Sequence, residues 1–179
     1  MFRMRKYEML GFFIISLITI GLSLLLYLMP DNYIVDGIKP TSDSLWQIGK
    51  LMFFSILIYT IIEYYLFGKN FNNFLFAKSA TLFLGPIIFI GLTYIIDLGF
   101  SLATPNSRIL TYMIALVFGQ YASYQILKDK IYFKLMNAYA VIGIILMIGI
   151  FIGFGRITNT FESPIFRSMD ESNKYIRGF

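Results

Sequence analysis

The chain contains no cysteine and no histidine among its 179 residues. These two absences exclude disulfide bonds, Cys-x-x-Cys redox pairs and zinc sites built from Cys and His ligands. They also exclude nucleophilic catalysis by a serine–histidine or cysteine–histidine arrangement. The ten acidic side chains are left as the charged ligands for a hard cation, and we expect neither a metal site nor a cofactor.

Charged residues are also scarce, at 14% of the chain against 58% hydrophobic residues. Soluble domains average about 25% charged residues, and a chain of this size could not hide so much apolar surface from water. We therefore predict an integral membrane protein whose main partner is the lipid bilayer. The net charge of +5 could indicate nucleic-acid binding. However, the basic residues cluster at the ends of apolar segments, which is typical of membrane orientation, and we expect no nucleic-acid partner.

Five apolar segments are long enough to cross a membrane as helices. A span needs roughly 20 apolar residues, because the hydrocarbon core is about 30 Å thick. The predicted spans are 9–29, 49–67, 74–96, 109–127 and 131–154. Short inner loops predict that consecutive helices are antiparallel neighbours, and Pro86 predicts a kink in the third span. The sequence thus predicts an all-α single domain, a bundle of five transmembrane helices followed by a tail over 155–179.

The ends of these segments predict the orientation in a cell membrane. The first segment is longer than the apolar region of a signal peptide and lacks a small-residue cleavage site after it, so we expect it to stay as a helix. With the N-terminus in the cytoplasm, the inner side holds seven Lys and Arg residues and the outer side, without the tail, holds four. By the positive-inside rule we predict a cytoplasmic N-terminus and an extracytoplasmic C-terminus.

Glu63 and Lys78 are charged residues that fall inside the predicted spans. Glu63 lies near the inner end of the second span, and Lys78 lies near the inner end of the third, at a similar depth on helices joined by a short turn. A charge at the centre of a span costs about 2.5–3.5 kcal/mol, so we predict a Glu63–Lys78 ion pair. The alternative is that Lys78 reaches the lipid headgroups and Glu63 reaches water at the inner face.

Other polar side chains fall in the same inner half of the bundle. Ser55, Tyr59 and Glu63 share one helix face, because they are spaced four residues apart. With Lys78 they could form a candidate polar cluster, to which the fourth and fifth spans would add Gln120, Tyr124 and Asn137. Such a cluster suits an ion or a small polar ligand. The alternative is hydrogen bonding that only holds the bundle together.

Small residues mark two helix faces for close packing. The fourth span carries them at a spacing of four: Thr111, Ala115, Gly119 and Ser123. The fifth span carries Gly149 and Gly153. Small side chains let helix backbones approach closely in lipid. These faces are therefore candidates for contact with neighbouring helices, with a second copy of the chain or with another membrane protein.

A second group of interest lies at the outer boundary of the second span. The only tryptophan stands there and is typical of an interface anchor. We expect Thr41 or Ser42 to cap a helix that opens near Asp43, which would make Asp43 and Lys50 near-neighbours. The candidate outer-face group is Asp43, Trp46, Lys50 and Asp170.

The polar tail over 155–179 contains Pro164 followed by the apolar pair Ile165 and Phe166. This pattern predicts that the tail docks on the 31–48 loop, with Phe166 and Tyr175 partly buried there. The alternative is a disordered tail, which is common at chain termini.

The segment around Trp46 resembles an uncharacterised bacterial family of multi-pass membrane proteins, a domain of unknown function. Its members carry P-V-N-E-S-x-W-E-H-x-K-L before an apolar span, then I-E-Y and F-x-F-A-K. This chain has P-T-S-D-S-L-W-Q-I-G-K-L at 40–51, I-E-Y at 62–64 and F-L-F-A-K at 74–78. Later residues that resemble the family are Gly119-Gln120, Ser123-Tyr124, Pro164, Phe166, Asp170 and Tyr175.

The chain departs from this motif at several positions on either side of Trp46. Gln47 and Ile48 stand where the family has Glu-His, and Ser42 and Asp43 stand where it has Asn-Glu. The resemblance implies a fold, a topology and a location in the bacterial cytoplasmic membrane, and it brings no activity.

Three functional interpretations remain open at this point. The leading one is a multi-pass membrane protein without enzymatic activity, whose role the sequence does not define. The second is a small transporter, or a transporter subunit, that uses the inner polar cluster. The third is a membrane enzyme that acts on a lipid headgroup with Asp43 and Lys50 at the outer face. A cavity that reaches the inner cluster would favour transport, and an outer cleft on which Asp43, Lys50 and Asp170 converge would favour chemistry.

Overall fold

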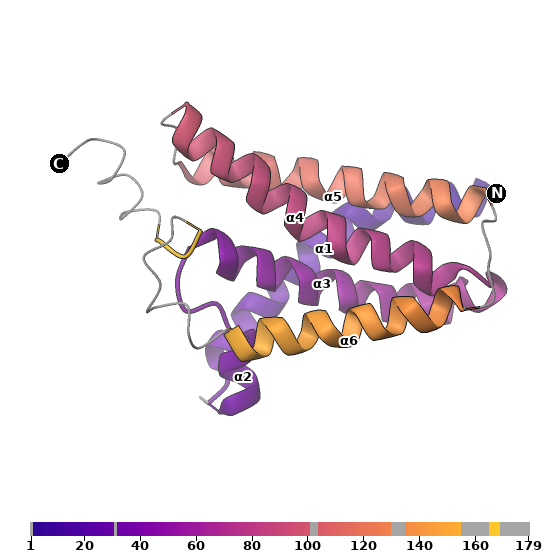
Figure 1. Cartoon of the computed structure of the whole chain (residues 1–179), viewed down its shortest axis with the longest axis horizontal. Coiled ribbons are helices and arrows are strands. Elements are labelled where there is room, and N and C mark those ends of the chain that lie inside the picture. The colour runs from indigo at the N-terminus through magenta and orange to yellow at the C-terminus, as the bar shows by residue number, and fades with distance from the viewer. Residues whose placement is uncertain (1, 31, 101–103, 130–134, 155–164, 169–179) are drawn as a thin grey trace.

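The structure, a computed structural model, describes residues 2–30, 32–100, 104–129, 135–154 and 165–168, and all regular secondary structure in these ranges is helical. The elements are α1 (Phe2–Leu28), α2 (Tyr33–Ile38), α3 (Leu45–Leu66), the 3₁₀ helix η1 (Gly68–Asn70), α4 (Phe74–Gly99), α5 (Pro105–Lys128) and α6 (Met136–Phe154). In Figure 1, α4 and α5 lie at the top, α6 lies below α3 with α2 at the lower left, and α1 passes behind α3. The all-helical prediction is confirmed for the described residues.

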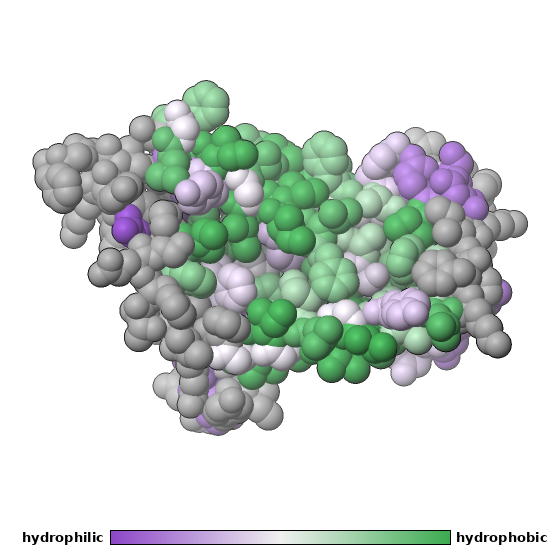
Figure 2. Space-filling model, viewed as in Figure 1, coloured by the Kyte–Doolittle hydropathy of each residue, from purple (hydrophilic) through white to green (hydrophobic). Residues whose placement is uncertain are grey.

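Four of the described helices are long and apolar enough to cross a membrane, in agreement with the predicted membrane protein. They are Glu8–Leu28, Leu45–Leu66, Phe74–Gly99 and Met136–Gly153. α5 covers the predicted fourth span, but it carries more polar residues than these four helices. Figure 2 shows apolar residues over the middle of the visible face and hydrophilic residues gathered near one end. A helix bundle with an apolar middle is what the bilayer requires.

The start of α3 differs from the prediction. Ser44 is extended and accepts a hydrogen bond from Gln47 N at 3.4 Å, so it is the N-cap, and the helix begins at Leu45. Thr41 instead accepts a hydrogen bond from Gln47 Nε2 at 3.1 Å. The prediction of a cap at Thr41 or Ser42 is therefore wrong, because the residue that caps a helix must lie next to its first free N–H groups.

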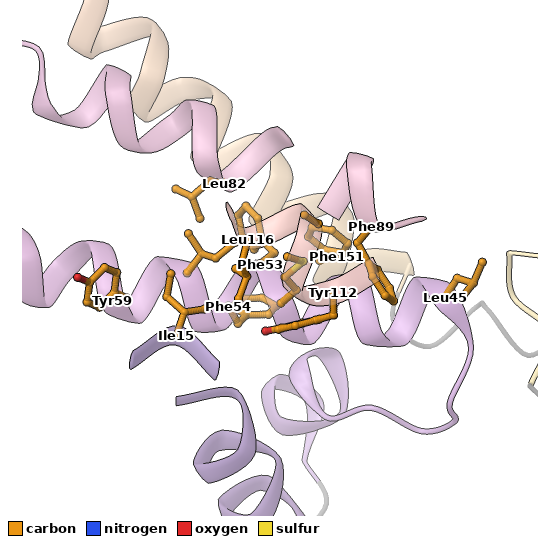
Figure 3. Packing of buried hydrophobic residues seen from close by; sticks show 13 residues of the cluster. Ile15, Leu45, Phe53, Phe54, Tyr59, Leu82, Phe89, Tyr112, Leu116 and Phe151 are labelled. Atoms are coloured by element: carbon orange, nitrogen blue, oxygen red, sulfur yellow. The ribbon is translucent and has the colours of Figure 1, made fainter. Parts of the chain in front are cut away.

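α3 is the central helix of the bundle. In its most apolar window 67% of the residues are buried, against 17% in α1 and 17% in α6. Its residues Phe53 and Phe54 lie in the main core cluster with side chains from α1, α4, α5 and α6, as Figure 3 shows. The ring of Phe151 on α6 lies 5.0 Å from Phe53 and 6.4 Å from Phe54, measured between centroids. Burial of these rings joins α6 to the rest of the bundle.

The order of neighbouring helices follows the chain only in part. α4 packs against both α3 and α5, as the short connections predict, and α1 packs against α3 and α5. α6, however, has its main contacts with α4 and α2 rather than with α5. The expectation that α6 neighbours α5 is therefore wrong. A short loop limits how far apart two helix ends lie, but the faces available for packing decide the partner.

The small-residue face of α5 packs within the chain against α4. Thr111 and Thr93 share a hydrogen bond between their hydroxyls at 2.7 Å, and Thr81 Oγ1 donates to the Gly119 carbonyl at 2.9 Å. A Cβ placed on Gly119 would lie 3.1 Å from Thr81 Cγ2. The close-packing role predicted for this face is confirmed. By contrast, a Cβ at Gly149 or at Gly153 would meet nothing within 4 Å among the described residues.

Candidate functional site

Three charged side chains from three helices meet at the end of the bundle where α3 turns into α4. Lys78 Nζ on α4 lies 2.5 Å from Glu63 Oε2 on α3 and 2.7 Å from Glu8 Oε1 on α1. Each of these side chains is at least 96% buried, since the exposed fractions are 1%, 0% and 4%. We call Glu8, Glu63 and Lys78 the charged triad. The predicted Glu63–Lys78 ion pair is confirmed, and Glu8 is an additional member.

The local fold explains why these residues meet. The short turn through η1 places the last turn of α3 level with the first turns of α4, which brings Glu63 to Lys78. α1 reaches them because Gly11 has no side chain. A Cβ at this position would lie 2.8 Å from Gln120 Nε2 and 2.8 Å from Tyr59 Cε1. Glycine therefore allows α1 to approach α3 and α5 closely enough for Glu8 to enter the triad.

Polar and aromatic groups surround the charged triad. Ser123 of α5 donates a hydrogen bond to Glu8 Oε1 at 3.1 Å, so a fourth helix joins the network. Lys78 Nζ lies 5.7 Å from the centroid of the Phe74 ring and 6.0 Å from that of Tyr59. Ring faces at this distance attract an ammonium group. The triad is thus held by ion pairs, a hydrogen bond and aromatic rings together.

Some hydrogen-bond acceptors in and beside the triad have no donor in the described part of the chain. Glu8 Oε2 and Gln120 Oε1 are buried and have no hydrogen-bond partner among the described residues. The triad also contains two carboxylates and one ammonium, so its formal charge is negative. An arrangement of this kind can accept a further hydrogen-bond donor or a positive charge, because a buried acceptor without a partner is costly.

A groove with a volume of about 500 Å³ runs along α1 and α5 beside the triad. Its lining consists of Glu8, Met9, Phe12, Phe13, Val117, Gln120, Tyr121 and Tyr124. The two buried polar residues of this wall, Glu8 and Gln120, each have an oxygen without a hydrogen-bond partner among the described residues. The structure therefore places Gln120 and Tyr124 of the predicted polar cluster beside the triad residue Glu8.

Asn137 and Ser55 make other contacts than the predicted cluster required. Asn137 Nδ2 donates to the carbonyl of Asn72 at 2.6 Å, so it connects the start of α6 to the turn before α4. Ser55 is buried on α3, and its hydroxyl donates to the carbonyl of Leu51 in its own helix at 2.8 Å. Asn137 therefore has its hydrogen bond to the turn rather than to the triad.

The outer-face residues take separate structural roles. Lys50 is fully buried, donates from Nζ to the Lys39 carbonyl at 2.9 Å and has the Asp36 carboxylate of α2 as an electrostatic partner. Asp43 is exposed, and its carbonyl accepts a hydrogen bond from Arg108 Nη1. The structure therefore gives Asp43 and Lys50 different partners. The predicted member Asp170 lies outside the described residues.

Trp46 contacts other parts of the chain. Its ring lies 5.0 Å from that of Phe151 on α6 and 5.6 Å from that of Phe166, and its backbone N donates to the Ile165 carbonyl at 3.2 Å. The predicted docking of Phe166 on the 31–48 loop is confirmed. Tyr175, the other residue of that prediction, lies outside the described residues.

A second buried ion pair was missed by the sequence interpretation. Arg108 Nη2 on α5 lies 3.2 Å from Asp97 Oδ2 on α4, and both side chains are buried. The signal was available, because Asp97 and Arg108 flank the turn between two consecutive spans just as Glu63 and Lys78 do. Glu8 carried a weaker signal, as an acid at the start of the first apolar segment.

Comparison with protein-family models, with curated proteins and with solved structures finds no match to this chain. The resemblance to a bacterial membrane family stays a prediction. The charged triad, the groove and the Asp97–Arg108 ion pair are therefore the features from which a function can be inferred.

Proposed function

We propose that the chain is a five-span protein of the bacterial cytoplasmic membrane with its N-terminus in the cytoplasm and its C-terminus outside. The spacing of its buried charges supports this placement. Asp97 follows Lys78 by nineteen residues on α4, which corresponds to about 28 Å along the helix axis. The hydrocarbon core is about 30 Å thick. The triad and the Asp97–Arg108 pair then lie near the two membrane boundaries, where a buried charge costs less than at the centre.

The distribution of polar residues on α5 supports its role as a membrane span, the fourth along the chain, in addition to the four helices named above. Its buried side holds the polar residues Arg108, Thr111, Gln120 and Ser123. Its exposed side holds Ile109, Leu110, Val117, Phe118 and Tyr121. A helix with polar groups inside and apolar groups outside suits a lipid surround and not water. Its 24 residues give a length of about 36 Å, sufficient to cross the core.

The burial of two basic residues supports the orientation. The outer side held four basic residues in the sequence count, two of which are Lys50 and Arg108. Both are buried in the bundle and bound to a backbone carbonyl or to a carboxylate. The positive-inside rule concerns basic residues near the helix ends that are free to face the membrane surface. When the two buried residues are left out of the outer count, the excess of basic residues on the inner side becomes larger.

Single-cysteine labelling tests this topology in a chain that has no native cysteine. Asn106 is exposed at the start of α5, and Asp129 is exposed just after its end. In intact cells, a membrane-impermeant maleimide should label Asn106→Cys and should label Asp129→Cys only after permeabilisation. Labelling of both from one side would show that α5 does not cross, and the reverse pattern would overturn the orientation.

For the role of the protein, we propose that it is non-enzymatic and that the triad fixes one arrangement of the bundle. The observation behind this proposal is that one buried network joins α1, α3 and α4 through the triad and α5 through Ser123. Lys50, which the enzyme alternative would need together with Asp43, is buried and donates to the Lys39 carbonyl within the chain. The free energy of unfolding of Lys78→Met, compared with that of the triple variant E8Q/E63Q/K78M, tests the structural role of the network.

Transport is the second candidate, and the groove beside Glu8 and Gln120 favours it. Proteoliposomes that contain a pH-sensitive dye test it by the lumenal pH change after addition of NaCl, KCl or methylammonium chloride. A transporter should give a pH change with at least one salt, which Glu8→Gln removes and the exposed-residue control Asp43→Asn retains. If no salt produces a change beyond that in protein-free liposomes, proton-coupled transport of these three cations is excluded.

A further inference from the structure

We propose that the groove between α1 and α5 binds an amphiphilic amine from the bilayer, a molecule with one protonated amine and an apolar body. The amine would lie against Glu8 and Gln120, and the apolar body would lie along the remainder of the groove. This proposal concerns binding alone, so it goes beyond the structural role above and does not depend on transport.

The charge of the triad indicates a cationic ligand. Glu8 Oε1 already accepts from Lys78 Nζ at 2.7 Å and from Ser123 Oγ at 3.1 Å. Glu8 Oε2 and Gln120 Oε1 stay without a partner among the described residues, although both residues are at least 96% buried. Two carboxylates face one ammonium in the triad. A ligand ammonium would supply both the donors that these oxygens lack and the positive charge that balances the second carboxylate.

The rest of the lining indicates an apolar ligand body. Beside the two polar residues, the wall consists of aromatic and aliphatic side chains, among them Phe12, Tyr121 and Val117. Aromatic faces also favour a cation that enters between them. The volume of about 500 Å³ lies within the range of about 300–1,000 Å³ that small-molecule sites occupy.

The exposure of the rim indicates the direction of entry. Phe13 on α1 and Val117 on α5 are exposed by 61% and 52%, on helices that we place in the membrane. The groove is therefore open towards lipid. Its lining contains an acid and, among the described residues, no basic side chain. A phosphate group would be unpaired in it, so an amine without a phosphate fits better than a phospholipid headgroup.

Binding to the full chain in phosphatidylcholine nanodiscs tests the proposal. The probe is radiolabelled dodecylamine, which is protonated at neutral pH, and the matched neutral probe is 1-dodecanol. We expect saturable binding of dodecylamine above that of empty nanodiscs and affinity for dodecanol that is weaker by about tenfold or more. Glu8→Gln should weaken dodecylamine binding by a similar factor.

A second pair of variants keeps the triad intact. Val117→Trp fills the groove, whereas Val141→Trp adds the same bulk to an exposed position of α6. Val117→Trp should abolish saturable dodecylamine binding, and Val141→Trp should leave it unchanged. If Glu8→Gln does not fold, as judged by circular dichroism, the comparison of Val117→Trp with Val141→Trp still tests whether the groove binds the amine.

Three results would overturn the proposal. Equal binding of dodecanol would show a purely apolar groove. Unchanged binding in Val117→Trp would place the amine elsewhere on the protein. Displacement of dodecylamine by phosphatidylethanolamine at equal membrane fraction would identify a lipid headgroup as the occupant.

Discussion

Lys78 is the residue on which the charged triad depends, because it supplies the ammonium that both carboxylates face. Removal of one acid leaves a balanced pair, whereas removal of the lysine leaves two buried carboxylates of like charge. A buried charge without its partner typically costs about 3–5 kcal/mol, while replacement of all charged members by apolar or neutral groups is often tolerated. The triad therefore makes the effects of single substitutions strongly unequal.

We predict that Lys78→Met lowers the free energy of unfolding by about 3–5 kcal/mol and that Glu8→Gln lowers it by less. The triple variant E8Q/E63Q/K78M should be more stable than Lys78→Met, because it contains no orphan charge. The double variant E63Q/K78M should recover only part of the loss, since Glu8 still lacks a counter-charge. Unfolding in mixed micelles with increasing SDS measures this series, and a double-mutant cycle gives the coupling. Purely additive effects would contradict it.

How far single residues could be predicted depended on the distance between partners along the chain. Glu63 and Lys78 flank one short turn, so helix geometry alone fixes their relative depth. Glu8 lies 70 residues before Lys78, and its place in the triad depends on where α1 crosses the bundle. A single sequence does not determine that crossing. The same reasoning could have predicted the Asp97–Arg108 pair, because these two residues also lie on consecutive helices on either side of one turn.

At the scale of helices, the clearest contrast lies between two glycines. Gly119 lies against Thr81 of α4, with 3.1 Å between a Cβ placed there and Thr81 Cγ2. Gly149 has open space at the same position, with nothing within 4 Å among the described residues. Both glycines lie in helices, so replacement by leucine should increase helix propensity by a similar amount at each position. A difference in stability between the two variants then reports the contact between α4 and α5.

We predict that Gly119→Leu destabilises the bundle and that Gly149→Leu does not. The leucine side chain at 119 must displace Thr81 and break its hydrogen bond to the Gly119 carbonyl, and overpacking of this kind costs about 1–3 kcal/mol. At 149 the side chain would point into open space. SDS unfolding midpoints of the two variants provide the measurement. Equal midpoints would show that the α4–α5 contact tolerates a larger separation.

The helices themselves were the most predictable part of the fold, since each span needs a long apolar run in the sequence. The ends of the helices were less predictable. The six-residue helix α2 is too short to give a periodic pattern, and the cap at Ser44 was one of several adjacent hydroxyl residues. The choice among such residues depends on which hydroxyl meets the free N–H groups, and this is decided by the backbone of the preceding loop.

At the scale of the whole molecule, the arrangement of the helices was the least predictable feature. Hydrophobic periodicity is weak in a membrane helix, because lipid and neighbouring helices are both apolar. The position of α6 follows from ring contacts of Phe151 with Phe53 and Phe54, between segments about 100 residues apart. The groove also depends on the arrangement of the helices, since α1 and α5 form it together.

The docked segment 165–168 gives a last prediction that depends on this long-range arrangement. Trp46 is the only tryptophan, and its ring lies 5.6 Å from that of Phe166. Phe166→Ala removes an apolar neighbour, so the emission of Trp46 should shift to longer wavelength as water approaches the indole. Phe100→Ala serves as the control, because Phe100 is an exposed aromatic residue at the end of α4. Deletion of residues 162–179 should give the same red shift and should increase protease cutting within 31–48. An unchanged spectrum and unchanged cutting would show that the segment does not cover Trp46 in the membrane.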